Sequence, residues 1–167
     1  MANVSDLLRD DLINLNMAAG DKVKALEELA DLISEKEKIS DREKFIKSIM
    51  AREGLESTGI GRGVAIPHAR TDTVERTVIA LGRSREGVDF ASLDGKPAHL
   101  IFLIVSPERD KSLYIKTLAR ISRLVRRDEF RRDLLRANSK EEVIALVRRN
   151  EEELAGPSSN GGVSRTI

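Results

Sequence analysis

Apolar side chains at helical spacing predict two helices in the first third of the chain. After Asp21, a suitable N-cap residue, apolar positions recur every three or four residues and predict an amphipathic helix over residues 22 to 36. Ser40, with Glu43 three residues later, has the pattern of a capping box. The apolar positions that follow predict a second helix, which we expect to end at Gly54.

The middle of the chain changes to short apolar runs that indicate strands. Residues Thr77 to Leu81 and Leu100 to Val105 are rich in β-branched side chains or bounded by Gly and Pro, as is typical of strands buried on both faces. Asp94 and Gly95, between the two runs, predict a turn. The middle of the chain is therefore its strand-rich part.

The helical period returns from Ser112 onward and predicts three more helices. The first carries Tyr114 on its apolar face, and the second contains Phe130. Ser139 with Glu142 has the capping-box pattern and predicts the start of the third.

Helices on both sides of a strand-rich middle predict a fold of the α/β class, arranged as a single layered domain over residues 1 to 154. The remaining residues, 155 to 167, are mainly Gly, Ser, Asn and Pro with little to bury. They predict a disordered tail.

Composition narrows the classes of function. Lys and Arg number 29 against 28 Asp and Glu, so the summed charge gives no general attraction to nucleic acid or to a membrane surface. The chain has no cysteine, which excludes a disulfide framework and a thiolate nucleophile, and its two histidines could bind zinc only if carboxylates filled most ligand positions. We therefore expect neither a metal ion nor a cofactor.

No segment has the pattern of a membrane span or an export signal. The longest strongly apolar run, Leu100 to Val105, is far shorter than a bilayer span, and residues 1 to 11 lack the apolar stretch of a signal peptide. The sequence therefore predicts a cytoplasmic protein without membrane insertion.

The least ordinary stretch is GLESTGIGRGVAIPHAR, residues 54 to 70, in which glycines at 59, 61 and 63 precede Val-Ala-Ile-Pro-His. Pro67 biases Ile66 towards an extended conformation, so His68 should lie at the end of an extended segment. A dinucleotide-binding turn needs Gly-x-Gly-x-x-Gly, and a P-loop needs Gly-Lys followed by Ser or Thr; this stretch has neither. Composition alone leaves open that the glycines serve tight packing and that His68 is an ordinary loop residue.

The functional interpretation of His68 is a nucleophile for a phosphoryl group. A neutral imidazole is available near neutral pH because its unperturbed pKa is about 6.5, and its unprotonated nitrogen can attack phosphorus without a metal. The charge on the phosphoryl oxygens requires cationic and N–H donors nearby. Candidate donors are the side chains of Arg52, Arg62 and Arg70 and the backbone beside the three glycines.

This stretch resembles a known signature. Its residues are Glu53, then after six residues Ile60-Gly61, then Arg62-Gly63-Val64-Ala65-Ile66-Pro67-His68-Ala69. They are similar to the signature of type-2 enzyme IIA domains of the bacterial phosphoenolpyruvate-dependent phosphotransferase system, in its fructose, mannitol and nitrogen-regulatory branch. The resemblance extends over residues 4 to 148 and includes Arg52, the Asp94-Gly95-x-Pro97 turn and Ser106-Pro107.

The resemblance implies a mixed β-sheet flanked by helices. It also implies that His68 accepts a phosphoryl group from the phosphocarrier protein HPr, or from its nitrogen-branch counterpart, and that Arg52 stabilises the phosphoryl charge. Two functions remain open. One is a phosphocarrier that passes the group to a IIB domain or signals its phosphorylation state; the other is a regulatory binding protein whose phosphohistidine acts as a switch without onward transfer.

The chain departs from the family pattern at one position. Many members carry a second histidine near the phosphorylated one, and the matching position, seven residues after Pro107, is Tyr114 in this chain. A phenol can donate a hydrogen bond to a phosphoryl oxygen but cannot become cationic; the alternative is a core residue with a solvent-reaching hydroxyl. His99 opens a predicted buried strand, matches no active-site position and is interpreted as structural.

Arginines are concentrated between residues 120 and 136. They are Arg120, Arg123, Arg126, Arg127, Arg131, Arg132 and Arg136. The carboxylates among them favour a solvated helix face, and the alternatives are a docking patch for an acidic partner or for a phosphate backbone. Phe130 is the only aromatic residue in the run, which argues against nucleic-acid recognition.

Overall fold

The longest apolar run of the sequence forms the central strand of a mixed sheet. In the computed structural model, which describes residues 3–156, this strand is β6 (Ala98–Ser106). It pairs antiparallel with β5 (Val78–Val88) on one side. On the other side it pairs in parallel with two short strands, β3 (Val64–Ala65) and β4 (His68–Arg70). The glycine-histidine stretch therefore lies directly against the central strand.

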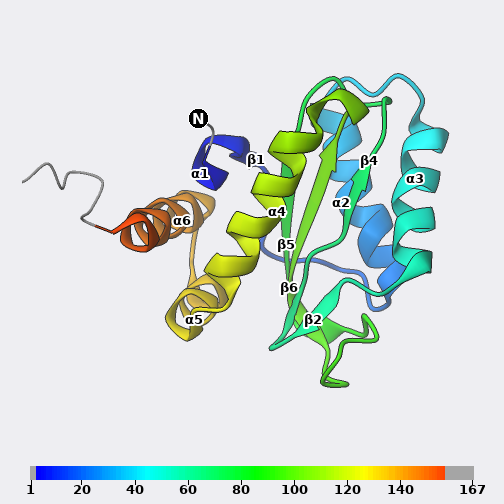
Figure 1. Ribbon diagram of the computed structural model, residues 1–167. Coiled ribbons are helices and arrows are strands. Elements are labelled where there is room, and N and C mark those ends of the chain that lie inside the picture. Colours follow the sequence, from blue (N-terminus) through cyan, green and yellow to red (C-terminus); the bar gives the residue numbers. More distant parts are fainter. Residues whose placement is uncertain (1–2, 157–167) are drawn as a thin grey trace, which may run out of the picture.

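Two further strands complete the sheet of the described residues, in the order β1-β5-β6-β3-β2 with β4 also on β6. β1 (Leu8–Asn14) runs parallel to β5, and β2 (Gly59–Gly61) runs antiparallel to β3 (Figure 1). The sheet is mixed, as expected from the sequence.

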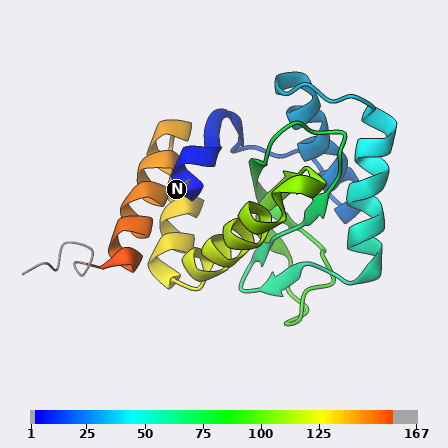
Figure 2. The same ribbon diagram turned by 45° about the horizontal axis from the view of Figure 1, so that its top comes forward.

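Helices cover both faces of the sheet. They are α1 (Val4–Leu7), α2 (Lys22–Lys36), α3 (Arg42–Leu55), the short 3-10 turn η1 (Glu108–Asp110), α4 (Lys111–Val125), α5 (Asp128–Arg136) and α6 (Lys140–Ala155). Figure 2 shows α2 and α3 on one side of the sheet and α1, α4, α5 and α6 on the other. The predicted α/β class, with a layered sheet between helices, is confirmed.

Side chains of β6 alternate between two cores. Leu103 and Val105 point into the core formed with α2 and α3, whereas Phe102 and Ile104 point into the core formed with the other helices. All four side chains are fully buried. Covering both faces explains why the strand is apolar at nearly every position.

The second predicted helix differs from its prediction at both ends. Its N-cap is Asp41 rather than Ser40: the Asp41 carboxylate accepts the backbone N–H of Lys44 at 3.1 Å, whereas the N–H of Ser40 donates to the carbonyl of Thr73. The helix also continues through Gly54 to Leu55, and the chain becomes extended only at Glu56, the C-cap. A glycine permits a helix to end but does not require it.

The strands are longer and more numerous than predicted. The run at Thr77 to Leu81 is only the start of β5, which continues to Val88. β1 was not predicted, because it mixes three charged residues with its apolar ones and its pairing with β5 shifts register between Leu8 and Ile13. The turn at Gly95 is confirmed: its N–H donates to the carbonyl of Ser92, and its φ is +71°.

The three C-terminal helices are confirmed, and Ser139 caps α6 by accepting the N–H of Glu142. α6 runs to Ala155, one residue past the predicted domain boundary, and most of the predicted tail, residues 157–167, lies outside the described residues. Between residues 3 and 156 no helix is long and apolar enough to cross a membrane.

Candidate phosphoryl-transfer site

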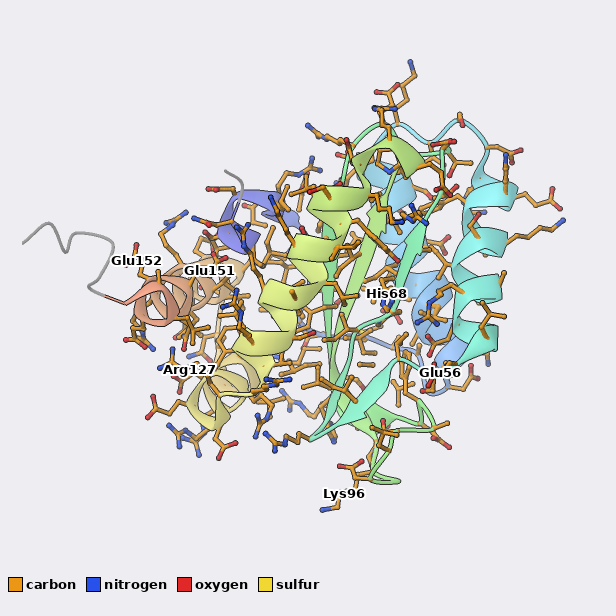
Figure 3. All side chains as sticks on the ribbon, in the orientation of Figure 1. Glu56, His68, Lys96, Arg127, Glu151 and Glu152 are labelled. Carbon is orange, nitrogen blue, oxygen red and sulfur yellow. The ribbon has the colours of Figure 1, made fainter. Side chains whose placement is uncertain are left out.

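His68 is the first residue of β4 and lies between α3 and α4 (Figure 3). Pro67, which has no N–H to donate, separates β4 from β3, while its carbonyl accepts the N–H of Ile104 at 3.0 Å. The predicted extended conformation is correct, and the side chain is half-buried. The backbone of His68 is therefore held by the central strand.

The two ring nitrogens of His68 have different partners. Nδ1 lies 2.7 Å from the carbonyl oxygen of Ile66, and Nε2 lies 3.3 Å from Nη2 of Arg52. A carbonyl can only accept a hydrogen bond and a guanidinium can only donate one, so the proton is assigned to Nδ1 and the lone pair to Nε2. The free lone pair of the ring is therefore on Nε2, facing Arg52.

The surroundings of His68 favour the neutral imidazole. Burial lowers the pKa of His68 below its ordinary value of 6.5, and the hydrogen bond to the Ile66 carbonyl opposes this change. The positive charge of Arg52 lowers the pKa further, whereas the negative charge of Glu53 raises it. The net direction is downward, so the ring is uncharged at neutral pH.

Arg52 reaches the site from the last turn of α3. Its Nη1 donates to the carbonyl of Glu56 at 3.1 Å, which leaves Nη2 facing His68. Arg52 therefore lies beside Nε2 of His68, with its guanidinium anchored at one end.

Tyr114 packs beside the imidazole from α4. The ring centroids of His68 and Tyr114 are 5.8 Å apart, and the planes are tilted by 56°. The guanidinium of Arg70 lies 5.8 Å from the tyrosine ring centre and is 3.3 Å from a carboxylate oxygen of Glu108. Burial raises the pKa of Tyr114, so its hydroxyl stays protonated and can donate a hydrogen bond. Tyr114 also packs against the core, as the alternative interpretation expected.

Two candidates lie away from this cluster. His68 pairs with Ile104 of β6, and His99 is five residues earlier on that strand, about 17 Å away at the usual rise per residue. His99 donates from Nδ1 to the carbonyl of Ser84 at 2.9 Å. Arg62 lies beyond Val64 at the same end of the sheet, where Asp94 accepts its backbone N–H. Residue type alone did not separate Arg62 from Arg52, whereas the family resemblance singled out Arg52; in the structure, strand register places Arg62 and helix α3 places Arg52.

The glycines of the signature pack against the segment between β5 and β6. A Cβ added at Gly59 would lie 3.0 Å from Phe90, and one at Gly61 would lie 3.3 Å from Asp94. Gly61 and Gly63 also have φ values of +87° and +78°, which favour glycine. These contacts support the packing interpretation of the glycines.

Glu53 opens the signature, but its residue type and position in the sequence predicted no role for it. Its side chain is buried, and it accepts hydrogen bonds from both the backbone N–H and the hydroxyl of Thr58. A signal was present: Phe45, Ile49 and Glu53 recur every four residues, which places the carboxylate on the buried face of α3.

Within residues 3–156 no group of three or more His, Asp or Glu side chains is placed to hold a metal ion.

The arginines of the C-terminal helices are partly paired. Arg127, labelled in Figure 3, lies 3.0 Å from Glu153 and donates to the side chain of Asn150. Arg131 pairs with Asp128. Arg120 and Arg123 lie on α4, whereas Arg131 lies on α5, so the run of arginines is divided between two helices. These pairs favour the solvated-face interpretation.

A family model and two relatives of known type all match this chain to the same family. Residues 6–150 match the family model described as phosphoenolpyruvate-dependent sugar phosphotransferase system, EIIA 2. The chain is 36% identical to the fructose-specific EIIA component of Haloferax volcanii, covering 86% of this chain and 93% of that protein. It is 38% identical to the fructose-specific EIIABC component of Bacillus subtilis over 89% of this chain, but spans only 23% of that longer protein.

A solved structure agrees with these relatives. The nitrogen regulatory protein IIA-Ntr of Neisseria meningitidis has a TM-score of 0.81 and 33% identity, covering 86% of this chain and 98% of that one. The chain therefore belongs to the type 2 EIIA family of the phosphoenolpyruvate-dependent sugar phosphotransferase system, and it is a phosphotransferase component.

Proposed function

We propose that Nε2 of His68 accepts a phosphoryl group from an HPr-type phosphocarrier protein. The observation that carries this proposal is the assignment of the lone pair to Nε2, which faces Arg52, while Nδ1 is held by the Ile66 carbonyl. No proton has to leave Nε2 before it attacks, and the pKa of the ring is lowered, so the reactive form predominates at neutral pH.

The transfer step needs only the Nε2 lone pair and the phosphorylated donor protein. The Nε2 lone pair forms a bond to phosphorus while the phosphorus–nitrogen bond of the donor's phosphohistidine breaks and its electron pair returns to the donor's nitrogen. Nδ1 keeps its proton and its bond to Ile66. Arg52, 3.3 Å from Nε2 before transfer, then pairs with the phosphoryl oxygens, and Tyr114 can donate one neutral hydrogen bond from the other side.

Exposed apolar side chains beside the site support a protein partner. Leu55, at the end of α3, is 83% exposed, and Ile115, next to Tyr114 on α4, is 53% exposed. Exposed apolar side chains that gather on one face of a protein are typical of docking surfaces for other proteins. We expect the HPr-type donor to dock here in the cytoplasm, and a IIB domain to dock here when the group is passed on.

A regulatory role is the second candidate, and a specific observation favours it. The nitrogen regulatory protein of Neisseria meningitidis matches this chain over nearly all of its own length, at 33% identity. In that case phosphorylation of His68 would add negative charge between α3 and α4 and change contacts with a target protein, without onward transfer.

Reconstituted phosphorylation tests the proposal. With phosphoenolpyruvate, enzyme I and an HPr-type protein, we expect one acid-labile, base-stable phosphoryl group on His68. His68→Ala should abolish labelling with its fold retained, because the side chain is only half-buried, and His99→Ala is the matched control that should keep it. Full labelling of His68→Ala would refute the assignment.

Addition of IIB domains separates the two candidates. Discharge of the phosphoryl group onto a IIB domain identifies a phosphocarrier. A stable phosphoprotein that no IIB domain of the organism discharges identifies a regulatory switch.

A further inference from the structure

Glu53 is a buried carboxylate one residue from Arg52, and it does not touch His68. It lies in the last turn of α3 and is only 6% exposed. Its Oε1 accepts the backbone N–H of Thr58 at 3.0 Å, and its Oε2 accepts the Thr58 hydroxyl at 2.8 Å. Nζ of Lys22, from the first residue of α2, lies 3.0 Å from Oε1 and balances the buried charge. These contacts fasten Thr58 to α3.

Hydrogen bonds continue from Thr58 to the imidazole. The carbonyl of Thr58 accepts the N–H of Ile66 at 3.0 Å, and the carbonyl of Ile66 is the acceptor of His68 Nδ1–H at 2.7 Å. The segment between α3 and β2 is only three residues long, so fastening Thr58 sets the position of β2 and β3 relative to the helix. The carboxylate is thus connected to Nδ1 through two backbone units.

The same turn of α3 reaches both nitrogens of His68. Arg52 contacts Nε2 directly, whereas Glu53 acts on Nδ1 through Thr58 and Ile66. The tautomer of a histidine is determined by the hydrogen bond that its other nitrogen makes. A shift of the Ile66 carbonyl would therefore allow the proton to occupy Nε2, where it blocks attack.

We infer that Glu53 is a positioning residue for His68: through Thr58 it holds the Ile66 carbonyl against Nδ1 and so keeps the Nε2 lone pair directed towards Arg52 and the incoming phosphoryl group. Lys22 is the counter-charge that keeps this carboxylate in place. The expected effect of Glu53 on phosphorylation rests on the proposed function. The expected effect of Glu53 on the tautomer of His68 does not.

The first test needs no reaction. Nitrogen-15 NMR of the unphosphorylated full chain reports which ring nitrogen carries the proton, and comparison with His68→Ala separates the two histidines. We expect His68 in the unaltered chain to be protonated at Nδ1 alone. A ring protonated at Nε2 would overturn the inference without any change at Glu53.

The second test changes the carboxylate. In Glu53→Ala we expect the Nε2–H tautomer of His68 to appear and phosphorylation by the HPr-type protein to slow by about tenfold. The reason is that the Ile66 carbonyl is no longer held against Nδ1 of His68. Glu53→Gln should fall between, since its amide oxygen can still accept the Thr58 N–H. Glu43→Gln, an exposed carboxylate on the first turn of α3, is the matched control and should change neither quantity.

The outcomes separate the two hypotheses. A single Nδ1–H tautomer in Glu53→Ala contradicts the inference, whether or not the rate falls, because the carboxylate would then act on stability or on docking. A mixed tautomer in that variant, with no phosphorylation of the unaltered chain, supports the inference and refutes the proposed function. If Glu53→Ala does not fold, Thr58→Val removes only the hydroxyl contact, and a smaller shift in the same direction is expected; no shift contradicts the inference.

Discussion

The imidazole of His68 and the guanidinium of Arg52 form an arrangement that has to change if Nε2 accepts a phosphoryl group, as we propose. Before transfer, Nη2 of Arg52 donates to the Nε2 lone pair over 3.3 Å, a long hydrogen bond that costs little to break. Nη1 keeps its contact with the Glu56 carbonyl, so the guanidinium can turn from nitrogen to phosphoryl oxygen without leaving the site. This preorganisation is the basis of electrostatic stabilisation in enzymes.

Arg52→Ala should slow phosphorylation of His68 by a factor of about 100, because loss of one charge-stabilising donor in a preorganised site costs about 3 kcal/mol. Stability should change little, since within residues 3–156 the hydrogen bonds of this side chain go only to His68 and Glu56. Single-turnover kinetics with saturating donor measures the effect. Arg42→Ala, an exposed arginine on the first turn of the same helix, is the control, and equal rates in the two variants would remove Arg52 from the site.

Tyr114→His should make phosphorylation newly sensitive to pH between about 6 and 7. The pKa of His68 is lowered below its ordinary value of 6.5, mainly by burial, so His68 gains less charge over this range than a free histidine does. A histidine at 114 would gain a positive charge beside it as the pH falls. We therefore expect transfer to speed up towards pH 6 relative to the unaltered chain.

Tyr114→Phe should slow transfer several-fold at every pH, because it removes one neutral hydrogen bond worth about 1 kcal/mol. Rates of the three proteins measured from pH 5.5 to 8 decide the role of the tyrosine. Superimposable profiles would show that Tyr114 only packs against the core.

The helices begin where a side chain can reach the free N–H groups of the first turn. Asp21, Asp41 and Ser139 each accept the backbone N–H three residues later and cap α2, α3 and α6. For α3 two neighbouring residues, Ser40 and Asp41, are both suitable caps by residue type. The contact of the Ser40 N–H with Thr73 moves the start of the helix one residue on.

Asp41→Ala should lower the free energy of unfolding by about 1 kcal/mol, the usual cost of losing an N-cap. Ser40→Ala should change it by a few tenths at most, because the Ser40 contact uses the backbone. Urea denaturation of both variants measures the difference. A larger loss of unfolding free energy in Ser40→Ala than in Asp41→Ala would identify Ser40 as the N-cap.

The two cores share one sheet, and Arg83 joins the sheet to the C-terminal helices. This residue of β5 extends to the end of α5, where its Nη1 donates to the carbonyls of Leu134 at 2.9 Å and Ala137 at 2.8 Å. Its Nε donates to the carbonyl of Leu15 at 3.1 Å. One side chain therefore satisfies carbonyls from two distant segments, which holds α5 against the sheet.

Arg83→Met should lower the free energy of unfolding by about 2 kcal/mol, because it leaves these partly buried carbonyls without a donor. Arg85→Met, the same change at an exposed position of β5, should cost far less. Chemical denaturation gives both values. Phosphorylation of the folded Arg83 variant should remain normal because the side chain does not contact the site, and comparable losses in the two variants would show that the carbonyls are solvated.

Local patterns in the sequence were sufficient for the type of most elements. Amphipathic spacing identified α2, α3 and the three C-terminal helices, and the uninterrupted apolar run of β6 identified a strand covered on both faces. The signature around His68 was sufficient for the family, since its residues are contiguous. These features depend on neighbours along the chain, so they can be read without the fold.

The tertiary structure alone decided everything that depends on distant residues. The sequence did not reveal β1 as a strand, because its apolar positions become regular only through pairing with β5. By residue type three arginines were equal candidates near His68, and the resemblance alone favoured Arg52. The fold separates them: helix packing brings Arg52 to Nε2, strand spacing puts Arg70 beside Tyr114, and strand register leaves Arg62 at the far end of the sheet. The nitrogen that carries the free lone pair was likewise decided by the Ile66 carbonyl, because the proton on an imidazole goes to the nitrogen that faces an acceptor in space.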